Sequence, residues 1–209
     1  SELHTKYYSM DDGSNVSFSA EERGYLQELQ DRQEVLKVAM DPAAAPYSYF
    51  DAQGNPQGIF PELFAEIAKR AGIPYRILPV SSREEYRQMI SRDAVDIDLG
   101  ALFDYSLAEQ SGFELTRPFI STFLAQLSRS DFSGTPASIA VSHDGLSHIL
   151  DKSGIFRGKE VYVLPTDQDC VDGVLAGKYD AAWLLTYTAQ KYLREDSHSR
   201  LRLSAMPKS

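Results

Sequence analysis

Apolar and polar residues alternate along the segment that begins at Leu36, and this alternation predicts a β-strand. In LKVAMD the side chains of Leu36, Val38 and Met40 fall on one face of an extended chain, because successive strand side chains point to opposite sides. A loop rich in proline and glycine follows over residues 42–60, with turn signals within residues 51–56. The pattern therefore predicts a strand that runs directly into a long loop.

The residues after this loop change to helical spacing and then return to strand spacing. The apolar positions between Pro61 and Gly72 predict an amphipathic helix, since proline suits a first helical turn and glycine suits a left-handed C-terminal cap. A strand is predicted over residues 75–80, a second helix from Ser82, and a further strand over residues 94–102. The order β-α-β-α-β implies a parallel sheet with helices on its faces.

A second unit repeats this order after residue 123. Strands are predicted at residues 138–142, 159–165 and 179–185, and helices at residues 144–156 and 166–178. The second of these helices is expected to begin at Thr166 or Asp167 and to stop at Gly177. Residues 121–130 are apolar and lack a flexible glycine-serine composition, so we expect a hinge strand between two small α/β lobes.

The first 35 residues differ from both units. Residues 11–17 are polar, and Ser19 with Glu22 forms a predicted capping box at the start of a helix. This region is expected to be a helical lead-in and linker.

Composition limits the chemistry of the chain. The formal net charge of -9 argues against nucleic acid or an anionic membrane surface as partner. The single cysteine, Cys170, excludes an internal disulfide, and the four histidines do not form a metal-ligand pattern, so no metal and no cofactor are expected. On its helix, Cys170 is expected to be a buried apolar residue. No apolar run approaches the roughly 20 residues of a membrane span.

Five segments, taken in their order and spacing, resemble a known family: residues 36–73, 93–102, 114–120, 138–145 and 174–185. They are similar to the type II periplasmic-binding-protein fold, the Venus-flytrap solute-binding domain of bacterial extracellular solute-binding protein family 3. The resemblance implies an α/β fold with two lobes, each a small parallel-type sheet flanked by helices.

The resemblance also implies boundaries for these parts. The expected parts are a lead-in over residues 1–35, lobe 1 over residues 36–124, lobe 2 over residues 125–200, and a crossover back to lobe 1 over residues 201–209. Lobe 1 is expected to be truncated, because family members complete it with a further helix.

The lead-in resembles the linker that precedes flytrap modules in membrane sensor proteins such as tandem-flytrap histidine kinases and diguanylate cyclases. Residues 2–8 look like the closing helix of a preceding module. This likeness implies a piece of a longer receptor, extracellular or periplasmic and tethered to the membrane. Adjacent modules are then expected partners, and a homodimer is compatible with the sequence.

Amino-acid binders of this family hold the ligand carboxylate with an arginine and the ligand ammonium with an aspartate. Here Glu109 stands at the arginine position and Leu185 at the aspartate position. Since a guanidinium pairs with both oxygens of a carboxylate, their loss implies a ligand other than a free α-amino acid. Glu109 is also interpreted as the partner of Ser106 in a capping box.

The expected cleft is aromatic and hydroxyl-bearing, because these residues follow predicted strands or begin predicted helices. The candidate ligand-binding residues are Tyr47, Tyr49, Phe50, Phe103, Asp104, Gly145, Leu146, Ser147, Thr166, Asp167, Trp183 and Thr186. The aromatic residues are equally suited to packing within a lobe, and Trp183 lies in an apolar strand that suits a core. Asp96 and Asp180, next to apolar strands, are interpreted as carboxylates that stabilise turns or lobes.

Two classes of function follow from these residues. The first is a binding module, a sensor that closes its lobes on a small molecule and passes the motion to a signalling output; an uptake-transporter receptor and a flytrap without ligand share its fold. The second is an enzyme, because some proteins of this fold dehydrate cyclic carboxylates, with Asp104, Glu109 and Asp167 as acid-base candidates. No nucleophile-base pair or phosphate loop supports catalysis, so the chain is expected not to be an enzyme.

Overall fold

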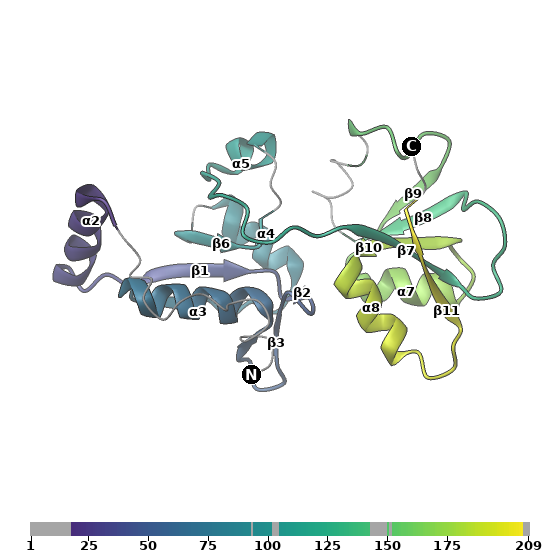
Figure 1. Cartoon of the computed structure of the whole chain (residues 1–209), viewed down its shortest axis with the longest axis horizontal. Helices are drawn as coiled ribbons and strands as arrows, with labels where there is room; N and C mark the ends of the chain where they lie inside the picture. Colours follow the sequence, from purple (N-terminus) through teal and green to yellow (C-terminus); the bar gives the residue numbers. More distant parts are fainter. Residues whose placement is uncertain (1–17, 93, 102–104, 143–149, 151, 207–209) are drawn as a thin grey trace, which may run out of the picture.

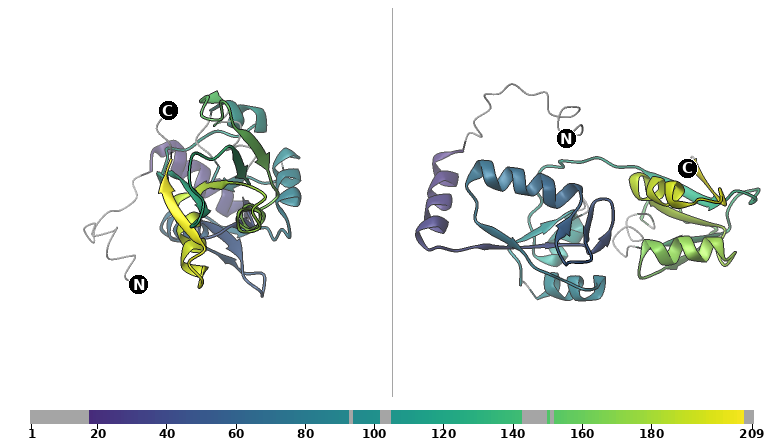
Figure 2. Two further views of the ribbon diagram at one scale, coloured as in Figure 1. Left: turned by 90° about the vertical axis from the view of Figure 1, so that its right-hand side faces the viewer. Right: turned by 90° about the horizontal axis from the view of Figure 1, so that it is seen from below.

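The computed structural model describes residues 18–92, 94–101, 105–142, 150 and 152–206. Two lobes lie one after the other along the long axis of the molecule, as expected from the two repeated units (Figure 1). The lead-in helix α2 (Ala20–Asp31) packs at the end of lobe 1 that is far from lobe 2, as Figure 1 and the right-hand view of Figure 2 show. Its capping box is present, since the Ser19 hydroxyl accepts from the Glu22 amide and the Glu22 carboxylate accepts from the Ser19 amide.

Lobe 1 contains the predicted parallel sheet. Its strand order is β5-β1-β6, with β1 pairing in parallel with both neighbours. Its strands and helices are β1 (Leu36–Met40), β5 (Tyr75–Ile77), β6 (Ile97–Leu99), α3 (Ile59–Ala71), α4 (Arg83–Ser91) and α5 (Tyr105–Ser111). The first strand of the sheet, β1, is its central strand, β5 pairs on one side of it and β6 on the other. Right-handed connections therefore place α3 and α4 on opposite faces of the sheet.

The loop between β1 and α3 has a structure that its turn signals did not predict in detail. It forms a small antiparallel sheet of β2 (Ala43–Ala44), β3 (Ser48–Phe50) and β4 (Pro56–Gln57). Gly58 then begins α3 with a φ of 116°, and a Cβ at this position would meet the backbone of Tyr47. Glycine is therefore required here for a close backbone approach as well as for its conformation.

Lobe 2 is a five-stranded mixed sheet with the order β11-β7-β10-β8-β9. Strands β8, β9 and β10 are parallel, whereas β7 and β11 run antiparallel to their neighbours. The elements are β7 (Leu124–Arg129), β8 (Ser138–Val141), β9 (Glu160–Val163), α7 (Asp167–Leu175), β10 (Ala181–Leu185), α8 (Thr186–Glu195) and β11 (Leu201–Ala205).

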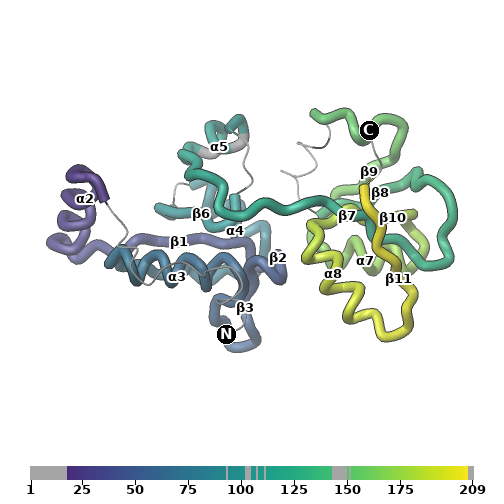
Figure 3. The backbone as a smooth tube through the Cα atoms, in the orientation of Figure 1, coloured from purple at the N-terminus to yellow at the C-terminus, as the bar shows by residue number. Residues whose placement is uncertain are grey.

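Three features of lobe 2 correct the expectations from sequence. Residues 124–129 belong to the sheet as β7, so the extended connection between the lobes lies before them, where the tube runs from α5 to β7 (Figure 3). Residues 201–205, expected as the crossover to lobe 1, pair with β7 as β11. Helix α8 was not predicted. In each case, pairing or packing partners distant in sequence decide the structure, and local periodicity does not report them.

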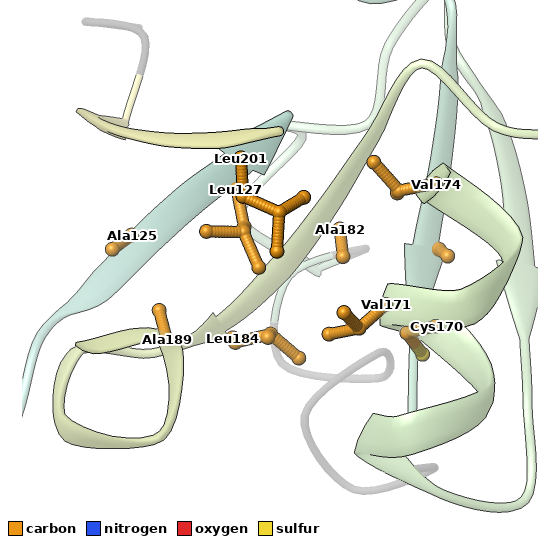
Figure 4. Packing of buried hydrophobic residues seen from close by; sticks show 10 residues of the cluster. Ala125, Leu127, Cys170, Val171, Val174, Ala182, Leu184, Ala189 and Leu201 are labelled. Carbon is orange, nitrogen blue, oxygen red and sulfur yellow. The ribbon is translucent and has the colours of Figure 1, made fainter. Parts of the chain in front are cut away.

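Both faces of the lobe 2 sheet are covered by apolar packing. Along β10, Ala182 and Leu184 join a cluster with α7 and α8, whereas Ala181 and Trp183 join a second cluster on the opposite face. Figure 4 shows the first cluster, in which Leu127 and other apolar residues pack between the sheet and the two helices. A strand buried on both faces explains the unbroken apolar run AAWLL.

Candidate ligand cleft

The two lobes face one another with the carboxyl ends of their parallel strands. In lobe 1, Asp41 directly follows β1, and α4 begins after the loop that follows β5. In lobe 2, Ser142 directly follows β8, and α7 begins after the loop that follows β9. Open α/β sheets bind ligands outside the carboxyl ends of their strands, so this meeting of four strand ends is the candidate cleft.

Arg83, the first residue of α4, joins the two lobes at this point. Its Nε atom lies 3.0 and 2.9 Å from the two carboxylate oxygens of Asp41, in lobe 1. Its Nη1 atom donates to the carbonyl oxygens of Ser142 (3.0 Å) and Pro165 (3.3 Å), in lobe 2. Arg83 is 8% exposed, so this arrangement is a buried charge network rather than a surface contact.

The second terminal nitrogen of Arg83 also contacts both lobes. Its Nη2 atom donates to the Ala43 carbonyl oxygen at 3.2 Å and lies 3.7 Å from a carboxylate oxygen of Asp167. Burial by itself lowers the pKa of the guanidinium, but Asp41 and Asp167 outweigh this effect and the pKa is raised above its ordinary value. The arginine is therefore held as a cation between two carboxylates.

Local capping interactions fix the carboxylates that surround Arg83. Asp41 accepts from the Ala43 amide at 2.8 Å, which is a short turn of the type aspartate favours after a strand. Asp167 is the first residue of α7 and accepts a hydrogen bond from the Ser142 hydroxyl. Thr166 caps the same helix in a capping box with Asp169. The two lobes thus present pre-positioned acceptors to one arginine.

A second titratable pair lies next to Asp41 in lobe 1. The Tyr86 hydroxyl donates to Asp98 at 2.7 Å. Burial raises the pKa of Asp98 to about 6; the hydrogen bond from Tyr86 opposes the rise and the charge of Asp41 adds to it. The carboxyl group of Asp98 is therefore protonated up to a higher pH than that of an exposed aspartate.

A cavity of about 510 Å³ lies beside Arg83 between the lobes. The residues around it are Pro42, Ala43, Ser81, Ser82, Arg83, Glu84, Arg87, Val163, Leu164, Pro165 and Thr166. The volume is within the range of small-ligand sites. The lining combines an apolar wall from β9 and its loop with the polar first turn of α4.

Aromatic residues make a second contact between the lobes, near the connection. The buried Tyr47 ring lies 6.1 Å from the ring of Tyr187 on α8 and 5.3 Å from that of Phe60. Its hydroxyl is 2.8 Å from the hydroxyl of Thr122, and the Thr188 hydroxyl donates to the Ala45 carbonyl at 3.2 Å. Tyr47, predicted as a ligand residue, is thus 1% exposed and bonded within the protein.

The structure distributes the other predicted ligand residues over several environments. Thr166 lines the cavity, and Asp167 pairs with Arg83. Tyr49 is on β3 and 36% exposed, and the Thr186 hydroxyl donates to the Phe123 carbonyl oxygen. Phe103, Asp104, Gly145, Leu146 and Ser147 lie outside the described residues.

Of the predicted ligand residues, Trp183 belongs to the core of lobe 2, which corrects its assignment, whereas Phe50 is half-buried beside the core of lobe 1. Trp183 is fully buried in lobe 2, stacks on Phe156 at 5.4 Å and donates from its indole nitrogen to Gln126. Phe50 packs against the lobe 1 core around Val38 and Met40. Trp183 lies on β10, whose two faces are both covered, so its side chain meets the core before it meets the cleft.

The predictions for other residues have mixed outcomes. The capping box of Ser106 with Glu109 is wrong, because α5 begins at Tyr105 and Ser106 lies inside it. Cys170 is confirmed as a buried apolar residue, and burial raises the pKa of its thiol to about 12. Asp96 and Asp180 are confirmed as stabilising carboxylates, since each accepts backbone amides of a neighbouring segment.

Arg83 and Asp41 are the functional residues that the sequence did not point to. A first-turn arginine is unfavourable for the helix dipole, and Glu84 and Glu85 follow it where carboxylates are preferred. This departure was the one available signal. Nothing local indicates that its hydrogen-bond partners are 40 to 82 positions distant.

Comparisons with known proteins agree with this geometry. The family model of the bacterial extracellular solute-binding proteins, family 3, matches residues 36–152, more than half of the chain. The chain belongs to this family, which is one of solute-binding rather than catalytic proteins. Comparison with curated protein sequences gives no match.

Solved structures share the two-lobed fold. A histidine kinase sensor domain with similarity to periplasmic binding proteins is 24% identical to this chain with a TM-score of 0.72, and the match covers 86% of this chain and 80% of the sensor domain. The Bordetella pertussis BvgS periplasmic VFT2 domain is 22% identical with a TM-score of 0.73, and the match covers 91% of this chain and 83% of that domain. An ancestral arginine-binding protein bound to glutamine is 14% identical with a TM-score of 0.67, covering 84% and 80%.

The described residues add two findings about the chain itself. None of their helices is long and apolar enough to span a bilayer. The same residues hold no group of three or more side chains suited to bind a metal ion.

Proposed function

We propose that this chain is an extracytoplasmic sensor module of a membrane-bound signalling protein, which responds to a small molecule in the interlobe cleft. The observation that carries the proposal is the cavity at the facing strand ends, because it is lined by residues of both lobes. A ligand that contacts both lobes changes their relative position, and hinge motion is an established means of transmitting a signal. The sensor domains of similar fold from a histidine kinase and BvgS support a signalling context.

The ligand proposed for this cleft is not a free α-amino acid. Glu109, at the position of the family's carboxylate-binding arginine, is an exposed residue of α5. Leu185, at the position of the ammonium-binding aspartate, precedes α8 and has no charge. Arg83, the buried cation of the cleft, already donates to protein acceptors in both lobes. An amino-acid carboxylate would have to displace these acceptors.

A catalytic role finds no support from the geometry of Asp167. As an acid-base group it would need access to a substrate proton, whereas its carboxylate meets Arg83 and Ser142. We therefore propose binding without turnover.

A ligand screen with two matched variants tests the proposal. Thermal unfolding would be followed with amino acids, small carboxylates, nucleosides, sugars and polyamines. A ligand at a hundred times its dissociation constant stabilises by about 2.7 kcal/mol and shifts Tm by several degrees. Ala43→Leu, which fills the cavity, should abolish the shift, and Ala44→Leu, on the next position of β2 and outside the cavity lining, should keep it.

Two results would contradict the proposal. A Tm that no compound moves, in the panel or in a larger metabolite library, removes the sensor function. A shift caused by free α-amino acids, with loss of that shift in Ala43→Leu, keeps the sensor and refutes the proposed ligand class.

A further inference from the structure

The guanidinium of Arg83 has all its donors directed at protein atoms. Arginine has five N–H groups in a planar fork. The Nε–H faces the Asp41 carboxylate, the Nη1 hydrogens face the Ser142 and Pro165 carbonyls, and the Nη2 group faces the Ala43 carbonyl and the Asp167 carboxylate. Four of the five N–H groups thus have hydrogen-bond acceptors in the protein, and the fifth lies opposite Asp167 at an ion-pair distance of 3.7 Å. The protein itself therefore supplies partners for the whole guanidinium group.

The acceptors of Arg83 are divided between the two lobes. Asp41 and Ala43 belong to lobe 1, as does Arg83 itself, whereas Ser142, Pro165 and Asp167 belong to lobe 2. Separation of the lobes would therefore remove three partners from a cation that is 8% exposed. Hydrogen bonds to charged groups are stronger than neutral ones, and burial strengthens them further.

From this division of partners we infer that Arg83 is an interlobe latch, which holds the lobes together before any solute binds. The resting state of the module is then the closed state. A solute changes the state only by as much as it prefers one arrangement of the lobes over the other. For such a module, the solute that signals is the one that opens the cleft or displaces the latch.

A second arginine has partners in one lobe only, so it separates the effect of losing an arginine from the effect of losing a contact between the lobes. Arg129, on β7, donates to the Val174 carbonyl at 3.1 Å and pairs with Asp131 at 3.3 Å. All of these partners lie in lobe 2, so its loss changes that lobe without changing how the two lobes meet. Arg129→Met is therefore the matched control for Arg83→Met.

Interlobe distance in the ligand-free protein tests the latch. Spin labels would be placed on Lys69→Cys in lobe 1 and Lys178→Cys in lobe 2, both exposed positions. Native Cys170 is fully buried and burial raises the pKa of its thiol to about 12, so the label reacts with the introduced thiols. The protein would be unfolded, dialysed and refolded first to remove any co-purified solute.

The expected result is a single short distance in the parent protein and a longer main distance in Arg83→Met. The ratio of open to closed forms should rise by roughly tenfold or more, since one charged hydrogen bond is worth at least this factor. Arg129→Met should keep the short distance. Asp167→Asn, which removes one lobe 2 charge and keeps the Ser142 contact, should shift the ratio in the same direction by less.

Either of two outcomes overturns the latch. One is a long or broad distance in the ligand-free parent protein. The other is an unchanged short distance in folded Arg83→Met or, should that variant not fold, in Asp167→Asn. The signalling meaning of the latch rests on the proposed function, but the distance is measured without solute. A silent ligand screen with a working latch would refute the sensor alone.

Discussion

Lobe 1 and lobe 2 both combine strands with helices, but they differ in how much core each contains among the described residues. Lobe 2 has five strands and two buried clusters, with ten residues on one face of the sheet and six on the other. The described residues of lobe 1 form three parallel strands and a small antiparallel sheet, with one buried cluster of Val38, Met40 and Leu99. The buried charges of the cleft, Asp41 and Arg83, both come from lobe 1.

This difference suggests a division of roles. Buried apolar area dominates the stability of a domain, so lobe 2 is the more self-sufficient platform. Lobe 1 gains part of its burial from its neighbours, with Leu29 of α2 on one side and the Arg83 network on the other. The lobe with the smaller core is the one whose state depends on contacts, which is the property a sensing element requires.

The largest expected effect on stability comes from removing one aromatic side chain from each lobe in turn. Trp183→Ala, fully buried in lobe 2, should reduce the free energy of unfolding by about 3–5 kcal/mol. Phe64→Ala, which removes the edge contact with Tyr75 in lobe 1, should cost less because Phe64 is partly exposed. Urea unfolding measured by circular dichroism gives both values. An equal or larger loss for Phe64→Ala would contradict the assignment of the stronger core to lobe 2.

Two corresponding aspartates allow a finer comparison. The Asp180 carboxylate accepts from the amides of Ala137 and Ser138 at 2.8 and 3.0 Å, and that of Asp96 accepts from the Lys37 amide at 2.7 Å. Asp180→Ala should cost about 1–2 kcal/mol, and Asp96→Ala less, because one amide loses its partner instead of two. Denaturant midpoints at pH 7 measure the difference.

The pH dependence of Asp180 provides an internal control. Backbone hydrogen bonds, the one from Ser138 first, hold the pKa of its carboxyl below the ordinary value. A lowered folded-state pKa stabilises the protein above the unfolded-state value, and this contribution is lost as pH falls through the folded-state pKa. The gap between the parent protein and Asp180→Ala should therefore narrow as pH falls below about 4. A gap that is constant down to pH 2 would argue against the carboxylate as its source.

Asp98 should show the opposite sign in lobe 1. Its pKa is raised to about 6 by burial, with the Tyr86 bond opposing and Asp41 adding to the rise, so folding favours the protonated form. Its contribution to stability is full below the unfolded-state pKa and is lost as pH rises through about 6. The parent protein should lose stability between pH 5 and pH 7.5, and the Asp98→Asn variant should lose less over the same range, as measured by urea unfolding. An unchanged loss in the variant would place the titrating group elsewhere.

The smallest expected effect is a gain. Within the described part of the chain, the Ser128 hydroxyl is fully buried on β7 and lacks a hydrogen-bond partner. Ser128→Ala removes an unsatisfied polar group and should stabilise lobe 2 by roughly 1 kcal/mol or leave it unchanged. A loss beyond 1 kcal/mol in thermal or urea unfolding would show that the hydroxyl has a partner, such as a bound water.

Much of the fold could be predicted because short-range patterns carry it. Alternation located β1 and helical spacing located α3, the pair Ser19 with Glu22 began α2 as expected, and Thr166 was one of the two expected starts of α7. At Ser82 the amide of Glu85 is capped, but the Glu85 carboxylate accepts from Ser81 instead of Ser82. Strand β11 and helix α8 were missed, since β11 is defined by pairing with β7 and α8 by packing on the sheet.

The candidate site was less predictable than the fold. Thr166 lines the cavity and Asp167 pairs with Arg83. The sequence places both at the start of a helix after a strand, which is a local property. Trp183 was misplaced because an apolar strand end gives no indication of which face meets the partner lobe. The sequence does not indicate Arg83, because its neighbours are typical of an exposed helix start.

The sequence by itself determined the alternating α/β order and the helix starts at Ser19, Ser82 and Thr166. Only the tertiary structure decided that Arg83 is a buried cation in the cleft and that both lobes supply its acceptors. The reason is physical. Capping and periodicity act between near neighbours in the chain, whereas burial of a charge is tolerated only when distant segments bring enough acceptors to it.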